Sequence, residues 1–413
     1  MITARAPGRL DVMGGIADYS GSLVLQRPIA ESTVVSCELI AQPVIEMRSA
    51  GRKPVAFELG PISYDDARKR FLAADEQTDE QRWAAYVAGV FLVLMHERNV
   101  AFRNGARIAI TSTVPAGKGV ASSAALEVAT MEAVTAAFGI SVEQKDKALL
   151  CQQAENLVAG APCGVMDQMT SVFGEPDALM ALLCQPAELQ PSVRVPEGLA
   201  FWGIDSSERH SVGGSDYTAV RTGAFMGHRI ITTLDPARDR YLANISPADF
   251  EKHFLPHLPE ELRGATFLAR YGGTIDTVTK VIPDRTYKIR RPTGHPIYEN
   301  DRVHHFGDLL RESAAEESGE LMYQSHASYS ACGLGSKGTD LIVNLVRAAG
   351  PKQGLYGARI TGGGSGGTVA VLGRADARDA ILKVAAEYAR ATGHRPYIFS
   401  GSSHGASVVT TKS

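Results

Sequence analysis

The first residues that could do chemistry form a glycine-rich stretch from Pro115 to Ala125, which reads PAGKGVASSAA. Gly117 and Gly119 let the backbone fold tightly around an anion, and Ser122 and Ser123 stand where a helix is expected to begin. Free N–H groups at a helix N-terminus bind phosphate, and a serine hydroxyl there can reach a divalent cation. No GKS or GKT follows the glycines, so this is not a Walker motif. The stretch predicts a phosphate site, with a serine-capped glycine turn as the alternative.

A second glycine run, Thr361 to Thr368, holds five glycines within six positions. Two short apolar segments, Ala358 to Thr361 and Val369 to Leu372, flank the run, so we expect a strand, a turn and a strand. Glycines in such a place allow a very close approach of the backbone to a neighbour or a ligand. A mobile surface loop is the alternative interpretation.

Charged side chains with the right chemistry for proton transfer lie in two further segments. Arg9 and Asp18 belong to the segment that follows the first expected strand. Glu155 lies near the end of one expected helix, and Asp167 lies at the start of the next. Carboxylates can accept protons or bind cations, although a solvated charge cluster and a helix N-cap are the plainer interpretations of these residues.

The elements that must position these residues mix strands and helices without a strict alternation, which favours an α+β fold over a doubly wound sheet. The first strand is expected to end at Pro7-Gly8, and the polar segment 236–285 is predicted to be helices and loops. A proline-rich change near residues 186–198 predicts two domains, 1–190 and 191–413. Strands are predicted at 2–6, 23–25, 33–39, 106–114 and 199–204, and helices at 82–96, 122–138, 142–158, from about 167, 216–233, 303–317 and 338–349.

The composition is that of an ordinary globular protein. The 413 residues are 44% hydrophobic and 21% charged, with a net charge of −3, which argues against a general nucleic-acid binder. The five cysteines are scattered, so neither a disulfide framework nor a zinc site is expected. The N-terminus shows no signal-peptide pattern, and the most apolar stretch, residues 84–95, is shorter than the roughly 20 residues of a membrane span. We therefore expect a cytoplasmic protein without a membrane or nucleic-acid partner.

Taken together and in order, these segments resemble the GHMP kinase superfamily, within it the galactokinase branch, and most closely the L-arabinokinases. Residues 9–19 resemble the sugar-binding first motif, residues 115–125 the phosphate loop, and residues 361–367 the third motif. Other similar segments are 82–87, 205–211 with 216–217, 324–335 and 401–403. The resemblance implies a two-domain GHMP kinase fold, with mixed and antiparallel sheets flanked by helices and an active-site cleft between the domains.

The resemblance also implies a role for individual residues. Asp167 would take the proton from the anomeric hydroxyl of a sugar, with Arg9 beside it as the second catalytic residue. Mg²⁺, bound with ATP, would be held by Ser123 and Glu155. The implied sugar-binding residues are Arg9, Asp18, Gly164, Asp167 and Tyr217. The implied ATP-binding residues are Trp83, Gly117, Lys118, Gly119, Val120, Ala121, Ser122, Ser123, Gly363 and Gly364.

One departure from the galactokinase pattern bears on the substrate. Galactokinases usually carry Gly-Glu-His-Thr-Asp-Tyr in the first motif, and this chain has Gly-Gly-Ile-Ala-Asp-Tyr at residues 14–19. The Glu-His pair of that family reads the exocyclic CH₂OH of galactose, which Gly15 and Ile16 cannot do. L-arabinopyranose is galactopyranose without that group, so the substitution favours L-arabinose, at a selectivity of about 1–3 kcal/mol for one such contact.

The prediction is therefore an ATP-dependent sugar 1-kinase that makes β-L-arabinose 1-phosphate and ADP. A galactokinase with a relaxed first motif is the alternative within the same class, and a catalytically weak sugar sensor is the alternative from another class. Retention of Ser122-Ser123-Ala124, Glu155 and Asp167 favours an enzyme over a sensor. We expect a monomer or homodimer that binds ATP and a small monosaccharide, and a chain that is the kinase unit alone.

Overall fold

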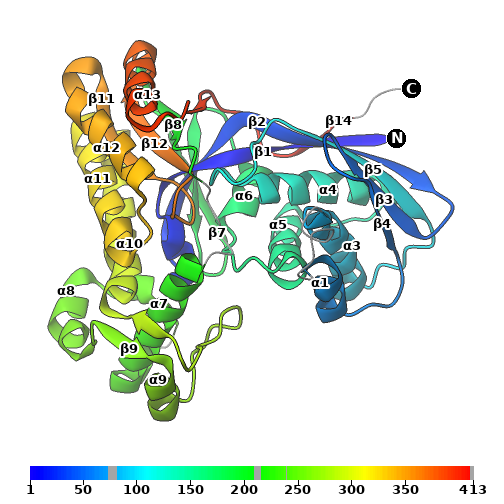
Figure 1. Ribbon diagram of the computed structural model, residues 1–413, viewed down its shortest axis with the longest axis horizontal. Helices are drawn as coiled ribbons and strands as arrows, with labels where there is room; N and C mark the ends of the chain where they lie inside the picture. Colours follow the sequence, from blue (N-terminus) through cyan, green and yellow to red (C-terminus); the bar gives the residue numbers. More distant parts are fainter. Residues whose placement is uncertain (73–80, 209–214, 239, 410–413) are drawn as a thin grey trace.

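The computed structural model describes residues 1–72, 81–208, 215–238 and 240–409. The chain forms two main sheets, each covered by helices, and a largely helical extension beyond the second sheet (Figure 1). The α+β class with mixed and antiparallel sheets is confirmed. Residues 209–211, part of a segment singled out for its resemblance to the second domain of galactokinases, lie outside the described residues.

The first sheet carries the elements that frame the site. Its strands lie in the order β14-β1-β2-β5-β3-β4, and β6 pairs with both β2 and β7. The β3–β5 pair is parallel, and the other neighbours are antiparallel. The strands are β1 (Ile2–Met13), β2 (Leu23–Ile40), β3 (Val44–Ser49), β4 (Val55–Glu58), β5 (Gly105–Ser112), β6 (Ala178–Leu183), β7 (Glu188–Arg194) and β14 (Ser407–Val409).

The expectation that the first strand ends at Pro7-Gly8 is wrong, because β1 continues to Met13 and carries Arg9 with it. The pairing of β1 with β2 shifts register between Pro7 and Arg9, and such a bulge accommodates a proline that has no N–H to donate. The Arg9 amide instead donates to the carbonyl of Val120, at 3.0 Å. The bulge thus joins the first strand to the phosphate loop.

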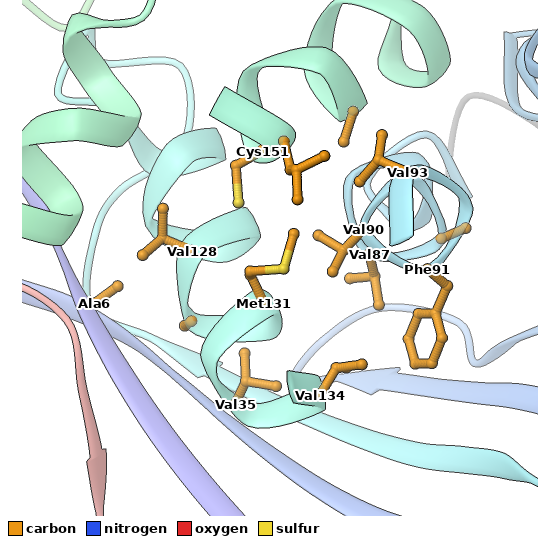
Figure 2. Packing of buried hydrophobic residues seen from close by; sticks show 14 of the residues in the cluster. Ala6, Val35, Val87, Val90, Phe91, Val93, Val128, Met131, Val134 and Cys151 are labelled. Carbon is orange, nitrogen blue, oxygen red and sulfur yellow. The ribbon is translucent and has the colours of Figure 1, made fainter. Parts of the chain in front are cut away.

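Helices cover one face of the first sheet and form a continuous hydrophobic core with it (Figure 2). Side chains of α3, such as Val90, interlock with Met131 of α4, while Val35 reaches them from the sheet and Cys151 from α5. Burying each side chain of this size contributes about 1.5–3 kcal/mol, which fixes α4 on the sheet. The helices are α1 (Tyr64–Leu72), α3 (Ala84–Arg98), α4 (Ser122–Phe138), α5 (Gln144–Ala154) and α6 (Met166–Phe173).

The helix predicted over 122–138 is confirmed, and Gly139 ends it in a left-handed conformation with φ of 66°. The helix predicted over 142–158 is shorter, because the regular turns of α5 stop at Ala154 and a wider π-type turn spans Glu155–Ala159. Such wide turns are frequent at functional sites. Here the turn starts at Glu155, one of the expected cation ligands.

The second sheet is antiparallel, in the order β11-β12-β8-β13. Its strands are β8 (Leu199–Asp205), β11 (Leu355–Ile360), β12 (Thr368–Arg374) and β13 (Ile398–Phe399), so the predicted strand, glycine turn and strand are confirmed. The helices of this half are α7 (Ser215–Leu234), α10 (Arg290–Arg311), α11 (Ala315–Cys332), α12 (Lys337–Ala349) and α13 (Arg378–Thr392). The extension holds α8 (Pro247–Asp249), β9 (Glu261–Arg263), α9 (Gly264–Tyr271) and β10 (Thr286–Lys288).

The single helix predicted over 303–317 is wrong, because two long helices meet there. The α10 helix ends at Arg311, Ser313 takes a left-handed φ of 60°, and α11 begins at Ala315. The start of α10 was missed because Pro292, Gly294 and Pro296 disfavour a helix in isolation. Packing of α10 against α7 and α11, and against β2 of the first sheet, overrides that preference.

The boundary predicted between residues 190 and 191 falls inside β7, and the division into two domains stays a prediction. The chain crosses from the first sheet to the second between β7 and β8, and it returns to the first sheet at β14. Within the described ranges, no helix combines the length and the apolar character needed to cross a bilayer.

Candidate active site

The phosphate loop adopts a backbone conformation suited to an anion. Gly117, Gly119 and Ala121 all have positive φ, of 72°, 70° and 57°, at alternate positions directly before α4. Alternation of right- and left-handed residues turns successive N–H groups to one side, which makes a concave anion site. A left-handed alanine costs about 1 kcal/mol or more, and such strain tends to persist where a ligand is bound. The start of α4 at Ser122 adds the free amides of a helix N-terminus.

A cavity of about 570 Å³ opens against this loop. It is lined on the opposite side by the wide turn after α5 and by the start of α6. The structure therefore brings together segments that lie more than 150 residues apart in the sequence. The predicted site residues on its wall are Arg9, Gly117, Gly119, Val120, Ala121, Ser122, Ser123, Glu155 and Asp167.

Arg9 and Asp167 form the central ion pair of the site. The guanidinium donates twice to Asp167 Oδ1, from Nε at 2.9 Å and from Nη2 at 2.7 Å, and Nη1 donates to the Gly119 carbonyl at 2.6 Å. Arg9 is almost fully buried, whereas 18% of the Asp167 side chain is exposed. Two charge-assisted bonds to one oxygen fix the orientation of the carboxylate. Asp167 is thereby oriented and still accessible from the cavity.

Two buried carboxyls lie beside Ser123. Burial raises the pKa of Glu155 to about 7, Asp167 adds to the rise, and hydrogen bonds from Ser123 and Gln168 oppose it. Glu127, one helical turn after Ser123, has its pKa raised well above the usual range by burial and by Glu155. Gln168 Nε2 bridges the two carboxyls, at 2.7 Å from Glu155 and 3.1 Å from Glu127.

These donors fit a magnesium ion. Mg²⁺ prefers oxygen ligands, and the group offers a hydroxyl and two carboxyls whose charge a cation would stabilise. Glu127 Oε1 is buried and has no hydrogen-bond partner in the described part of the chain. No set of three His, Cys, Asp or Glu side chains among the described residues is arranged to hold a metal by itself, so water and phosphate oxygens would complete its shell. The sequence analysis did not single out Glu127. It could have been found as a glutamate in an otherwise apolar helix, four residues after Ser123.

Asp18 lies in a short 3-10 helix, η1 (Gly15–Ser20), behind Asp167. Burial raises the pKa of Asp18 to about 7, the nearby Asp167 raises it further, and Arg221 opposes the rise. Oδ1 of Asp18 is buried and accepts no hydrogen bond from any residue that the structure describes. Gly164 faces this carboxyl so closely that a Cβ there would lie 1.8 Å from Oδ2, so only glycine fits. Tyr217 is buried nearby, in edge contact with Tyr19.

Asp18, Gly164 and Tyr217 are thus brought together, but none of them is part of the described wall of the 570 Å³ cavity. With residues 14–16, they form a second region, here called the sugar side after the role predicted for Asp18, Gly164 and Tyr217. The phosphate loop with Ser123, Glu127 and Glu155 is called the phosphate side. Arg9 and Asp167 belong to both regions.

Three consecutive amides of the sugar side each donate to a buried side chain. Gly14 N donates to Glu299 Oε1 at 3.2 Å, and Gly15 N to Asp11 Oδ1 at 3.1 Å. Ile16 N donates to the hydroxyl of Tyr329 at 2.6 Å. Glu299 lies in α10 and Tyr329 in α11, so helices of the second half hold the loop of the first. Sequence reasoning assigned no role to either residue.

A fully buried ion pair connects this loop to the third motif. Asp11 Oδ2 lies 3.0 Å from Arg359 Nη1 and accepts the Gly362 amide at 3.3 Å. A Cβ at Gly362 would lie 3.1 Å from the Gly119 carbonyl and 3.3 Å from Arg9 Nη2. The close approach expected of the third motif is therefore an approach to the phosphate loop and Arg9. Arg359 was missed, although an arginine within an apolar strand is itself a signal of a buried partner.

Four predicted ATP contacts have other neighbours in the structure. Gly363 and Gly364 do not line the 570 Å³ cavity within the described chain, and a Cβ at Gly364 would meet Leu334 at 2.7 Å. Lys118 Nζ pairs with Asp205 Oδ2 at 2.8 Å. Trp83 lines an adjoining cavity of about 500 Å³, which shares Tyr86, Gly117, Ser122 and Ser123 with the first. Their roles toward ATP stay predictions.

Two family models match parts of this chain. Residues 85–175 match the GHMP kinases N terminal domain, and residues 308–390 match the GHMP kinases C terminal domain. A galactokinase of Chloroflexus aggregans is 30% identical over 94% of this chain and 88% of its own length. The chain belongs to the GHMP kinase family. The resemblance found in the sequence motifs is confirmed.

Two further relatives refine the placement of this GHMP kinase. The L-arabinokinase of Arabidopsis thaliana is 44% identical over 98% of the chain, and the chain spans 46% of that protein's length. The crystal structure of Lactococcus lactis galactokinase complexed with galactose superposes with a TM-score of 0.80 over 98% of this chain and 94% of that one, at 21% identity. That structural match shows a galactokinase-like fold.

Proposed function

We propose that this GHMP kinase transfers the γ-phosphoryl group of ATP to the anomeric hydroxyl of L-arabinose, giving β-L-arabinose 1-phosphate and ADP. The observation that carries the proposal is the Asp167 carboxylate, held by Arg9 at the wall of a cavity whose other wall is the phosphate loop. The 44% identity to an L-arabinokinase supports the choice of sugar. Gly15, which has no side chain to read an exocyclic group, supports it independently.

The residues divide the work of phosphoryl transfer between positioning and charge stabilisation. Asp167 accepts the proton of the anomeric hydroxyl while that oxygen forms its bond to the γ-phosphorus and the bond to the ADP oxygen breaks. Arg9 orients Asp167 and places a positive charge beside the transferring group, where a loose anionic transition state needs it. Amides of residues 117–123 bind the phosphates, and the adjoining cavity beside Trp83 takes the nucleoside.

Ser123 and Glu155 hold Mg²⁺ in this proposal. Glu127 is linked to Glu155 because both carboxylates accept a hydrogen bond from Gln168 Nε2. A bound Mg²⁺ supplies charge neutralisation to the phosphates of ATP. The raised pKa of Glu155 follows from burial without a cation, so the protein's own contribution is a preformed site whose carboxyls gain stability when a cation arrives.

Asp18 and Tyr217 bind the sugar ring in this proposal. Oδ1 of Asp18, buried and without a partner among the described residues, is the acceptor for a ring hydroxyl. Gly164 has no side chain to fill the space beside that carboxyl. We further propose two domains, 1–190 and 191–413, a cytoplasmic location, a monomer or homodimer, and no nucleic-acid or membrane partner.

A galactokinase is the second candidate, because a 30% identical relative bears that name. A coupled ADP-release assay with ATP and Mg²⁺ separates the candidates by comparing L-arabinose with D-galactose. We expect a higher kcat/KM for L-arabinose. A higher value for D-galactose would establish the galactokinase instead. Sugar binding without ADP release above that of Asp167→Asn would establish a sensor.

A further inference from the structure

One long segment of the extension is held in place by a buried aspartate. Residues 272–285 connect α9 to β10 and form no helix or strand of their own. Most connections between elements are about 4–6 residues long, and longer ones without secondary structure are often functional. The segment is largely exposed, yet the side chain of Asp276 is only 2% exposed. A carboxylate is rarely so buried without a partner, so this segment is expected to contact a cation.

The partner of Asp276 is Arg221 of α7. The guanidinium makes two hydrogen bonds to the carboxylate, from Nε to Oδ2 at 2.9 Å and from Nη2 to Oδ1 at 2.8 Å. Within the segment, Thr279 donates to Oδ2 from its hydroxyl at 2.6 Å and from its amide at 3.2 Å. Burial opposes the ionised form of Asp276, but the hydrogen bonds and the charge of Arg221 outweigh it and lower the pKa. This two-bond pair fixes the position of the segment relative to α7.

The same guanidinium contacts two loops of the sugar side. Its Nη1 donates to the carbonyl of Pro162 at 3.3 Å, two residues before Gly164. It also lies 5.2 Å from the ring centroid of Tyr19, the residue that follows Asp18. Arg221 therefore connects the extension to both loops that meet at the Asp18 carboxyl.

Arg221 also acts on Asp18 through its charge. Burial raises the pKa of Asp18 to about 7, and Asp167 and Asp11 add to the rise, whereas Arg221 makes the largest opposing contribution. Oδ1 of Asp18 has no hydrogen-bond partner in the described part of the chain, so Arg221 favours the carboxylate without occupying that oxygen. Tyr217 precedes Arg221 by one helical turn on the same face of α7. One face of α7 thus carries a predicted sugar contact and the cation that supports another.

We propose that Arg221 is a positioning residue for the sugar, which holds the segment 272–285 against the loops around Asp18 and keeps a positive charge near that carboxylate. The inference rests on the proposed function, because it concerns the sugar site of the kinase. Arg221 acts through Asp18 and touches no reacting atom. Its loss should weaken sugar binding and leave the KM for ATP within about twofold of the wild type, since the phosphate loop makes none of these contacts.

The test compares Arg221→Met with Asp276→Asn, because both changes break the same ion pair and only the first removes the cation. The KM for L-arabinose is measured between pH 6 and pH 9 at saturating ATP and Mg²⁺. It should rise as pH falls through the pKa of Asp18. In Arg221→Met the midpoint of that rise should move upward by about one pH unit, which raises the KM at pH 7 about fivefold. In Asp276→Asn the midpoint should not move upward, because the cation remains.

Arg290→Met is the control. Arg290 also holds a part of the extension, through two hydrogen bonds to the Leu258 carbonyl and an ion pair with Glu260. Its loss should leave the sugar KM and the midpoint unchanged. An active wild type whose midpoint is unaltered by Arg221→Met overturns this inference alone. A wild type inactive on L-arabinose and D-galactose overturns the proposed function and the inference with it, and if D-galactose is the better substrate the same profile is measured with that sugar.

A double variant keeps the test decisive if the single one does not fold. Arg221→Met leaves Asp276 buried without its partner, which can unfold a protein, whereas Arg221→Met combined with Asp276→Asn leaves no unpaired charge of this pair. The upward shift of the midpoint should persist in the double variant. Calorimetric titration of L-arabinose without ATP measures the same weakening without turnover. Wild-type sugar affinity and pH dependence in the folded double variant would overturn the proposal and leave Arg221 a structural residue only.

Discussion

The phosphate side and the sugar side of this kinase are built in different ways. The phosphate side takes its shape from its own backbone, with left-handed residues at 117, 119 and 121 and a helix that begins at the next residue. The sugar side is held largely by side chains from distant elements, since Glu299 and Tyr329 bind the amides of Gly14 and Ile16, while the nearby Asp11 binds that of Gly15. The backbone turns of the phosphate loop are thus locally encoded, and the sugar side depends on the packing of the two halves. Substitutions should therefore act locally on one side and through the fold on the other.

The largest effect is expected at Asp167, where the two sides meet. Asp167→Asn keeps the size of the side chain but removes the proton acceptor, so kcat should fall by about 10²–10⁴-fold. The KM for ATP should stay near its wild-type value, because Asp167 is connected to the phosphate loop only through Arg9, which the substitution retains. Steady-state ADP release measures both, with Asp146→Asn, a change in an exposed ion pair, as the control. More than a tenth of wild-type kcat in Asp167→Asn would contradict the assignment.

The next effect concerns the fold that supports the sugar side. Asp11→Ala leaves Arg359 fully buried without its partner, and breaking such a pair costs about 3–5 kcal/mol of unfolding free energy. Denaturant unfolding measures the loss. Asp11→Ala combined with Arg359→Met should recover part of it, since no charge then remains buried. A loss below about 1 kcal/mol would show that the sugar side does not need this pair.

The same difference explains what the sequence could and could not predict. Gly117, Gly119 and the start of α4 at Ser122 are local signals, and the phosphate loop was predicted from them. The contacts of the Gly14 and Ile16 amides were not, because the sequence around a backbone amide does not show which distant side chain will bind it. Those partners come from residues 299 and 329, and only the folded chain brings them together.

The fold shows the same limit. The helix over 122–138 was predicted residue for residue because its capping glycine and its period are local. The start of α10 was missed because its prolines disfavour a helix locally, and its packing against α7, α11 and β2 overrides them. Tertiary packing also carries β1 through Pro7, which brings Arg9 to Asp167.

A smaller effect should separate the two sides by pH. Burial raises the pKa of Asp18 to about 7, and the charge of Asp167 contributes to the rise while Arg221 opposes it. Asp11 and Tyr217 also face this carboxyl. The ionised form is the better acceptor for a sugar hydroxyl, so the KM for the sugar should rise by about tenfold as pH falls from 8 to 6. Asp18→Asn should raise that KM at pH 8 and abolish its pH dependence. A persisting dependence in the variant would assign it to another group.

Stability gives a second readout for the same carboxyl. Because the folded pKa exceeds the unfolded one, Asp18 contributes stability that is present below about pH 4 and is lost as pH rises through about 7. The wild type should therefore lose more Tm between pH 5 and pH 8 than Asp18→Asn does. Equal slopes for the two proteins would contradict the raised pKa.

The smallest effect on catalysis is expected at Lys118, although it lies inside the phosphate loop. Its ammonium pairs with Asp205 of β8, and in the proposed function backbone amides bind the phosphates without it. Lys118→Met should change the KM for ATP by less than about threefold, while lowering the unfolding free energy by about 1–3 kcal/mol. Lys147→Met is the matched control, because Lys147 makes a similar buried pair with Glu132, at 2.9 Å, away from the loop. A tenfold rise in the KM for ATP in Lys118→Met alone would show that this side chain turns to the nucleotide, and that the phosphate side is not a purely backbone site.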